Sequence, residues 1–259
     1  MKPKLTGHLI TAISLLAILN FACTKNPDPA PTPKSDIDLA KGLILYFPFT
    51  GSIADSSGNN NPVQPTGGAA LTSDEHGNTN SAYDASQGRL IVTNNGSIKF
   101  DTAFSVCFNF KIRTNGYQGF LSMVDNVTGH GPTFLLGPHL QSTPAFSFSV
   151  QDQTASCSDF AQVSNSNNDT TSFLPVVGTW YNIACIYHKG NVEVFMNGKS
   201  ISPRNSPGTS ALLCLNSKFI IGGWWNSDPL TMDGIIDEVR MYNRVLNGDE
   251  INQLYKNFQ

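Results

Sequence analysis

The chain has 259 residues, of which 40% are hydrophobic and 14% charged, and its formal net charge is −3. Apart from the first 22 residues, this composition is typical of a soluble globular protein. Without Lys2 and Lys4 the balance is 14 basic against 19 acidic residues, so the chain lacks the basic excess that nucleic-acid binding requires. We therefore expect no nucleic-acid partner.

Residues 1–22 predict an export signal. Lys2 and Lys4 give a positive start, and the apolar run from Leu9 to Ala22 is too short to cross about 30 Å of hydrocarbon comfortably. The following "NFAC" resembles a bacterial lipobox, although Asn20 stands where Leu is usual. This resemblance implies lipidation at Cys23, with ordinary secretion as the alternative.

Residues 23–35 form the expected linker. Four prolines alternate with other residues in "NPDPAPTPK", which favours an extended, semi-rigid stalk. A lipidated Cys23 would carry several acyl chains, enough for stable membrane attachment. We therefore expect an exported protein that is lipid-anchored to the bacterial outer membrane or cell surface.

Residues 36–259 predict one all-β domain, because short apolar runs alternate with Gly, Asn, Ser, Pro and Asp clusters. In the segment 103–112, apolar and polar residues alternate, which predicts one core face and one solvated face. A tight turn at Asn197-Gly198 predicts a meander of three strands over 180–202. The predicted strands cover residues 42–49, 88–93, 103–112, 119–124, 133–137, 145–151, 180–190, 191–198, 218–224 and 234–244.

A short helix is expected at the end of the chain. Asn247 and Glu250 have the spacing of a capping box, and Leu246 with Ile251 fit the hydrophobic staple that accompanies it. The sequence therefore predicts a β-sandwich that ends in one helix.

Several blocks occur in an order that resembles the laminin G-like, concanavalin A-like jelly-roll domains of bacterial surface proteins. This resemblance implies a two-sheet antiparallel jelly-roll sandwich, with loops around a concave face and the first and last strands side by side. The blocks are "GLILYFPFTGSIADSSGNNN", "SAYDASQGRLIV", "AFSVCFNFKI", "VGTWYNIACIYHKGNVEVFMNGKSI", "KFIIGGW" and "DGIIDEVRMYNRVLNGDEINQLY".

Catalysis finds little support in the residues. Glucanases that resemble this fold carry an E-x-D-x-x-E strand, which this sequence lacks. Regular alternation would place Asp237 and Glu238 on opposite faces of their strand, so they could not flank one glycosidic bond. We expect a protein that is not an enzyme, and a divergent glycoside hydrolase remains the weakest alternative.

A non-catalytic surface module that binds carbohydrate is the favoured interpretation. Trp224 and Trp225 lie at a strand end beside a polar loop, where an indole could stack on a sugar, although one of the two is expected to point into the core. Tyr117 is a weaker candidate for ligand contact. The alternative is a structural or adhesive domain that binds a surface protein.

Four cysteines follow the linker. We predict a disulfide between Cys157 and Cys214, which lie near loops, and facing thiols at Cys107 and Cys185, which lie within strands. Four reduced, buried cysteines are the alternative.

A structural calcium ion is the expected cofactor. On regular alternation Asp237 lies on an apolar face with Ile235, Val239 and Met241, and a buried carboxylate needs a partner. If the first and last strands are adjacent, Asp55 and Asn60 could join Asp237 as oxygen ligands. The resemblance also implies a structural calcium near one edge, and hydrogen bonds from backbone amides or serines to Asp237 are the alternative.

Overall fold

The computed structural model describes residues 37–100, 102–124, 133–138, 146–151, 173–204, 214, 217–224 and 231–259. Asp36–Gln259 form one compact unit. The predicted signal (1–22) and linker (23–35) lie outside the described residues. Within the described part, no helix is long and apolar enough to span a membrane.

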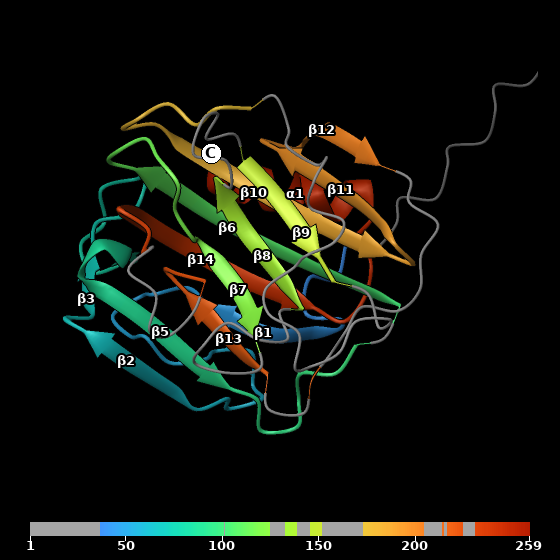
Figure 1. The fold of residues 1–259 in the computed structure, drawn as a ribbon, viewed down its shortest axis with the longest axis horizontal. Coiled ribbons are helices and arrows are strands. Elements are labelled where there is room, and N and C mark those ends of the chain that lie inside the picture. Colours follow the sequence, from blue (N-terminus) through green and yellow to red (C-terminus); the bar gives the residue numbers. More distant parts are fainter. Residues whose placement is uncertain are drawn as a thin grey trace, which may run out of the picture. The chain divides into compact units, whose positions relative to one another are not determined.

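One layer is an eight-stranded antiparallel sheet with the order β12-β11-β10-β6-β14-β4-β3, and β1 pairs with β14 outside this path (Figure 1). The pairing of β1 with β14 confirms the expected adjacency of the first and last strands. The predicted meander over 180–202 is also confirmed, as β10-β11-β12. The strands are β1 Leu43–Phe47, β3 Ala70–Thr72, β4 Ala82–Asp84, β6 Ala103–Ile112, β10 Trp180–His188, β11 Asn191–Met196, β12 Lys199–Arg204 and β14 Gly234–Tyr242.

The second layer is a six-stranded antiparallel sheet with the order β2-β5-β13-β7-β8-β9. The two packed sheets confirm the predicted sandwich. A short 3-10 helix, η1 (Ala85–Gln87), joins β4 to β5. The strands are β2 Val63–Gly67, β5 Gly88–Thr93, β7 Leu121–Val124, β8 Phe134–Pro138, β9 Phe146–Val150 and β13 Lys218–Ile221.

The core lies between the two sheets and is rich in phenylalanine. The expected alternation along β6 places Phe104, Phe108 and Phe110 in the core. Phe104 stacks on Phe134 of the other sheet with ring centroids 5.4 Å apart, and Phe110 stacks on Phe146 at 6.1 Å. These ring pairs fix the two sheets against each other.

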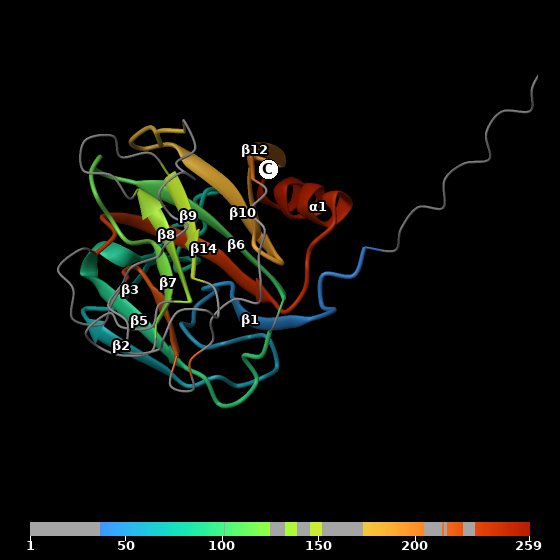
Figure 2. The ribbon, with the colours of Figure 1, turned by 45° about the vertical axis from the view of Figure 1, so that its right-hand side comes forward.

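The opposite face of β6 is not solvated as predicted. Ser105, Cys107 and Asn109 are 0%, 2% and 2% exposed. The reason is a third element, the helix α1 (Gly248–Phe258), which packs on the outer face of the eight-stranded sheet (Figure 2). Alternation along one strand cannot reveal that a distant helix covers its polar side.

The helix begins as predicted. The side chain of Asn247 accepts from the backbone N–H of Glu250 at 3.0 Å, and the Glu250 carboxylate accepts from the backbone N–H of Asn247 at 2.9 Å. Arg244 also donates to both oxygens of Glu250, each at 2.8 Å. Leu246, Ile251 and Leu254 pack on Cys107, Ala184, Ile186 and Tyr242 of the sheet.

The cysteines divide into two kinds. Cys107 and Cys185 are free thiols among the described residues. Cys107 packs under α1, whereas Cys185 lies in the core between the sheets, so the prediction that these thiols face each other is wrong. Cys214 is disulfide-bonded, which contradicts the alternative of four reduced cysteines. Its predicted partner, Cys157, lies outside the described residues, so that pairing stays a prediction.

Candidate functional site

A row of polar side chains crosses the part of the outer face next to α1. Asp237 of β14 is in register with Asn109 of β6, and Asn109 is in register with Asn182 of β10, so the three side chains share one face. Asn182 donates from Nδ2 to Oδ1 of Asn109 at 2.8 Å, and its backbone N–H donates to Oδ1 of Asn197 at 3.0 Å. We call Asp237, Asn109 and Asn182 the outer-face row, and these bonds fix its two asparagines.

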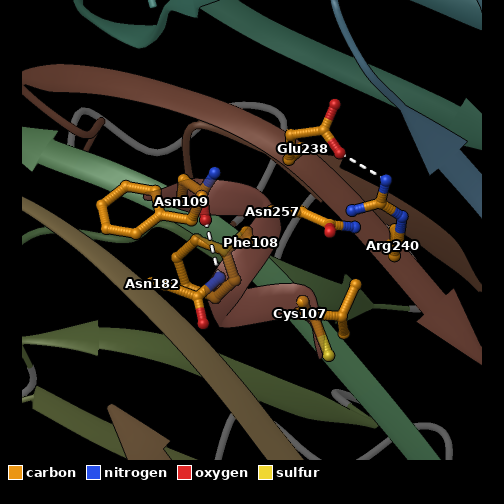
Figure 3. Close-up of a pocket in the computed structure, with 9 residues that line it drawn as sticks. Cys107, Phe108, Asn109, Asn182, Glu238, Arg240 and Asn257 are labelled. Atoms are coloured by element: carbon orange, nitrogen blue, oxygen red, sulfur yellow. Dashed lines mark hydrogen bonds and ion pairs between the residues drawn. The ribbon is translucent and has the colours of Figure 1, made fainter. Parts of the chain in front are cut away.

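A pocket of about 30 Å³ lies between α1 and two members of the outer-face row, Asn109 and Asn182 (Figure 3). This volume holds about one or two water molecules, or a single hydroxyl group, but not a sugar ring. Its lining combines amides, one ion pair and the apolar side of the helix. The lining residues are Cys107, Phe108, Asn109, Asn182, Glu238, Arg240, Leu254, Asn257 and Phe258.

A β-bulge in β14 brings both acids of the "IDEVR" segment to this face. The register shifts between Asp237 and Arg240, and Glu238 adopts a positive φ of 52°. Ile236 and Val239 point into the core on either side of the bulge. Asp237, Glu238 and Arg240 therefore lie on the outer face, and the predictions that the two acids take opposite faces and that Asp237 shares a side with Val239 are wrong.

Glu238 forms a compact group with Arg240 and Tyr46. Glu238 makes an ion pair with Arg240, which also donates to the Tyr46 hydroxyl at 2.8 Å. The Tyr46 hydroxyl donates to Glu238 at 3.1 Å, and the guanidinium lies 4.2 Å from the centroid of its ring. Burial, chiefly, raises the pKa of Tyr46 to about 12, so the phenol remains a donor at neutral pH.

Asp237 has an unusual environment for a carboxyl group. It is 4% exposed, and its Oδ1 has no hydrogen-bond partner among the described residues. Burial and, second, the charge of Glu238 raise the pKa of Asp237 from 3.8 to about 9, so it is a neutral acid at pH 7.

A second buried acid, Glu75, lies next to the outer-face row. Asn109 Nδ2 donates to Glu75 at 3.4 Å, and Glu75 Oε2 is buried without a hydrogen-bond partner among the described residues. Burial raises the pKa of Glu75 as well.

Trp180 lies on the same face and next to the outer-face row. It is half-buried, two residues before Asn182 on β10, and in register with Lys111 of β6. The Lys111 ammonium lies 5.0 Å from the centroid of the indole. The sequence interpretation did not single out Trp180, although its spacing from Asn182 places both on one strand face.

The residues predicted to stack on sugar lie elsewhere. Trp224 is 1% exposed and its Nε1 donates to the Leu136 carbonyl at 3.0 Å, in a cluster on the outer side of the six-stranded sheet. Tyr117 packs edge-on against it, with ring centroids 4.7 Å apart. Trp224 is therefore a packing residue and not a stacking surface, and Tyr117 is not at the pocket. Trp225 lies outside the described residues, so its role stays a prediction.

The three predicted calcium ligands do not form one donor set. Among the described residues, five donors from Tyr46, Ser57 and Asn61 reach the carboxylate of Asp55, at 2.8 to 3.1 Å. Burial alone would raise the pKa of Asp55, but the hydrogen bonds from Ser57 and Asn61 hold it below its ordinary value. Hydrogen bonds from backbone amides and a serine were the predicted alternative to calcium at Asp237, and here they are made to Asp55.

Asn60 shares a separate surface pocket of about 340 Å³ with Asp55, whereas Asp237 belongs to the outer-face row. Within the described part of the chain, no group of three His, Cys, Asp or Glu side chains could hold a metal ion, although calcium also accepts carbonyl oxygens as ligands. The Asp55 carboxylate accepts five hydrogen bonds, and Asp237 does not line the pocket that Asp55 and Asn60 share, so calcium binding by these three residues stays a prediction for solution experiments.

The two acids on the outer face do not form a glycosidase pair. Asp237 is buried, Glu238 is held by Arg240 and Tyr46, and the adjoining pocket is too small for a sugar ring. Acid and base catalysis requires two carboxyl groups on either side of one glycosidic bond. This geometry favours binding over hydrolysis.

Comparisons with known proteins agree with the fold. Domain 4 of AbnA, an extracellular GH43 arabinanase from Geobacillus stearothermophilus, solved in complex with arabinotriose, has a TM-score of 0.61 and 19% identity over 82% of this chain and 98% of that chain. The binding domain of botulinum neurotoxin DC has been solved with SialylT (TM-score 0.59) and with rat synaptotagmin II (TM-score 0.55). In both cases the identity is 16%, over 86% of this chain and 53% of that chain.

No curated protein matches the sequence. A family model described as the concanavalin A-like lectin/glucanases superfamily matches residues 84–252, about two thirds of the chain. This match covers more than half of the chain, and the two antiparallel sheets agree with it. The chain therefore belongs to the concanavalin A-like lectin/glucanases superfamily.

Proposed function

We propose that the protein is a non-catalytic carbohydrate-binding module whose ligand lies on the outer face of the eight-stranded sheet. The observation that carries this proposal is the outer-face row beside the pocket. Side-chain amides both donate and accept hydrogen bonds, which matches the dual character of sugar hydroxyls. Asn109 and Asn182 are held in register by their mutual hydrogen bond, so little side-chain entropy is lost when a ligand binds.

The pocket and Trp180 supply the remaining elements of a sugar site. A pocket of about 30 Å³ accepts one hydroxyl group, while the rest of the sugar would lie outside the part of the face that α1 covers, over the half-buried Trp180. The half-buried Trp180 offers apolar area next to the amides, a combination that ligand sites typically use. The complex of the similar arabinanase domain with arabinotriose supports the same ligand class.

A glycan array on the full-length protein, solubilised in mild detergent, tests this proposal. Titration calorimetry of the best ligand then compares Trp180→Ala and Asn182→Ala with Asn191→Ala, which removes an amide at the far end of the β10-β11 hairpin. We expect the first two variants to weaken binding about tenfold or more, and the third to bind normally. Binding to no glycan, or equal binding by all variants, would contradict the proposal.

One observation favours the alternative of a protein-binding domain. Leu174, Val176 and Val177 are 50%, 60% and 43% exposed, which makes a short apolar surface segment before β10. A protein ligand would be indicated by an inactive glycan array together with capture of a surface protein that Val176→Ser abolishes. Loss of glycan binding in Trp180→Ala would instead favour the carbohydrate site.

The cellular location is part of the proposal and rests on the sequence. The apolar leader, "NFAC" and the Pro-rich linker support export and a lipid anchor at Cys23, on the bacterial outer membrane or cell surface. An anchored module on a stalk would present its binding face to external glycans.

A further inference from the structure

The charges at the pocket are balanced within the protein. Within the described part of the chain, the charged residues that line the pocket are Glu238 and Arg240, and they pair with each other. Arg240 also donates to the Tyr46 hydroxyl and lies against its ring. The guanidinium is therefore already engaged and is not available to a carboxylate of a ligand.

The groups next to the pocket add negative charge. Glu75 contacts Asn109, and Asp74 precedes it in the same loop. Besides burial, the charges of Glu75 and Asp74 are close enough to Asp237 to raise its pKa, and at a pKa of about 9 this acid carries no charge at neutral pH. His76 approaches Glu75 at 3.8 Å from an exposed position. Lys111 is a cation on this face, but its ammonium lies over the Trp180 ring, two residues from Asn109 along β6.

We infer that the outer-face site takes neutral glycans and rejects acidic ones, and that Glu238 sets this selectivity by neutralising Arg240. The inference rests on the proposed carbohydrate-binding function. A neutral hydroxyl can donate to Glu238 or accept from the amides without adding charge. A ligand carboxylate would have to displace Glu238 from Arg240 while lying near Glu75, and like charges in such proximity oppose binding.

The substitution Glu238→Gln tests the role of this residue. It keeps the shape of the side chain but removes the counter-charge, so Arg240 becomes an unpaired guanidinium suited to a carboxylate. Glu193→Gln is the matched control, because Glu193 lies on β11 of the same sheet, accepts from Ser200 and does not line the pocket. Glu75→Gln is a second variant that lowers the negative charge without disturbing Arg240.

The probes are matched neutral and acidic oligosaccharides, such as lactose with sialyllactose and digalactose with digalacturonate, titrated into the full-length protein in detergent. We expect the neutral member to bind about tenfold or more tightly than its acidic partner. In Glu238→Gln this ratio should fall about tenfold or reverse, and in Glu193→Gln it should not change. Melting temperatures of all variants would show that each is folded.

The outcomes separate the two proposals. Equal or tighter binding of the acidic members by the wild type, or an unchanged ratio in a folded Glu238→Gln, would overturn the selectivity inference and leave carbohydrate binding intact; a ratio that falls only in Glu75→Gln would also overturn the role of Glu238. If no probe of either kind binds and the glycan array is also silent, the proposed function itself is contradicted.

Discussion

The buried carboxyl group of Asp237 should make the stability of the protein depend on pH. Asp237 is 4% exposed, and in the folded state its pKa rises from 3.8 to about 9, by burial and by the neighbouring charge of Glu238. A raised pKa means that the folded state binds this proton more tightly than the unfolded state. The resulting stabilisation is complete below about pH 4 and is lost progressively as the pH rises to about 9.

The substitution Asp237→Asn removes this dependence because an amide is neutral at every pH. Each pKa unit corresponds to about 1.4 kcal/mol, so between about pH 4 and pH 7 the wild type loses about 4 kcal/mol of stability that the variant keeps. We expect the two proteins to be equally stable near pH 4 and the variant to be more stable by about 4 kcal/mol at pH 7.

Urea unfolding followed by tryptophan fluorescence, at several pH values from about 4 to 9, measures this difference. Glu193→Gln removes a carboxylate from the same sheet at a partly exposed position and should change stability by no more than about 0.5 kcal/mol. A stability gain in Asp237→Asn that is the same at all pH values, or a loss at pH 7, would refute the reasoning.

Three further predictions concern the other candidate residues. Asp55→Ala should lower the free energy of unfolding by about 3 kcal/mol with or without a chelator, because the carboxylate accepts five hydrogen bonds. A loss of stability that is confined to calcium-containing buffer would instead support a calcium site. Trp224→Ala should cost about 3 to 5 kcal/mol of stability and leave glycan affinity per folded molecule unchanged, whereas weakened binding in a fully stable variant would restore Trp224 as a ligand residue. Cys23→Ser should move the protein from the membrane to the soluble fraction, and retention on membranes would contradict lipidation.

The sequence predicted the fold well because its signals are local. Phe104, Phe108 and Phe110 alternate with other residues within one strand, and the capping box of Asn247 and Glu250 lies within four residues. The strands β2, β3 and β4 were not predicted. They are short, and β2 contains Pro65, which is tolerated because this strand is at the edge of its sheet.

The candidate site was harder to predict because it depends on contacts between distant segments. Asn109 and Asn182 are 73 residues apart, and only the pairing of β6 with β10 makes them neighbours. The bulge at Glu238 interrupts the alternation, so regular spacing wrongly grouped Asp237 with the core residues Val239 and Met241. The sequence places Trp224 and Trp225 beside a predicted polar loop, whereas Trp180 lies within a predicted strand and carries no such signal.

The central claim, that a neutral glycan binds on the outer face of the eight-stranded sheet, is tested most directly by hydrogen–deuterium exchange with and without the best neutral oligosaccharide. We expect slower exchange in residues 107–110, 180–184, 238–241 and 254–258, which surround the pocket. Protection confined to residues 117–124 and 218–224, around Tyr117 and Trp224 on the other sheet, would contradict this location of the site.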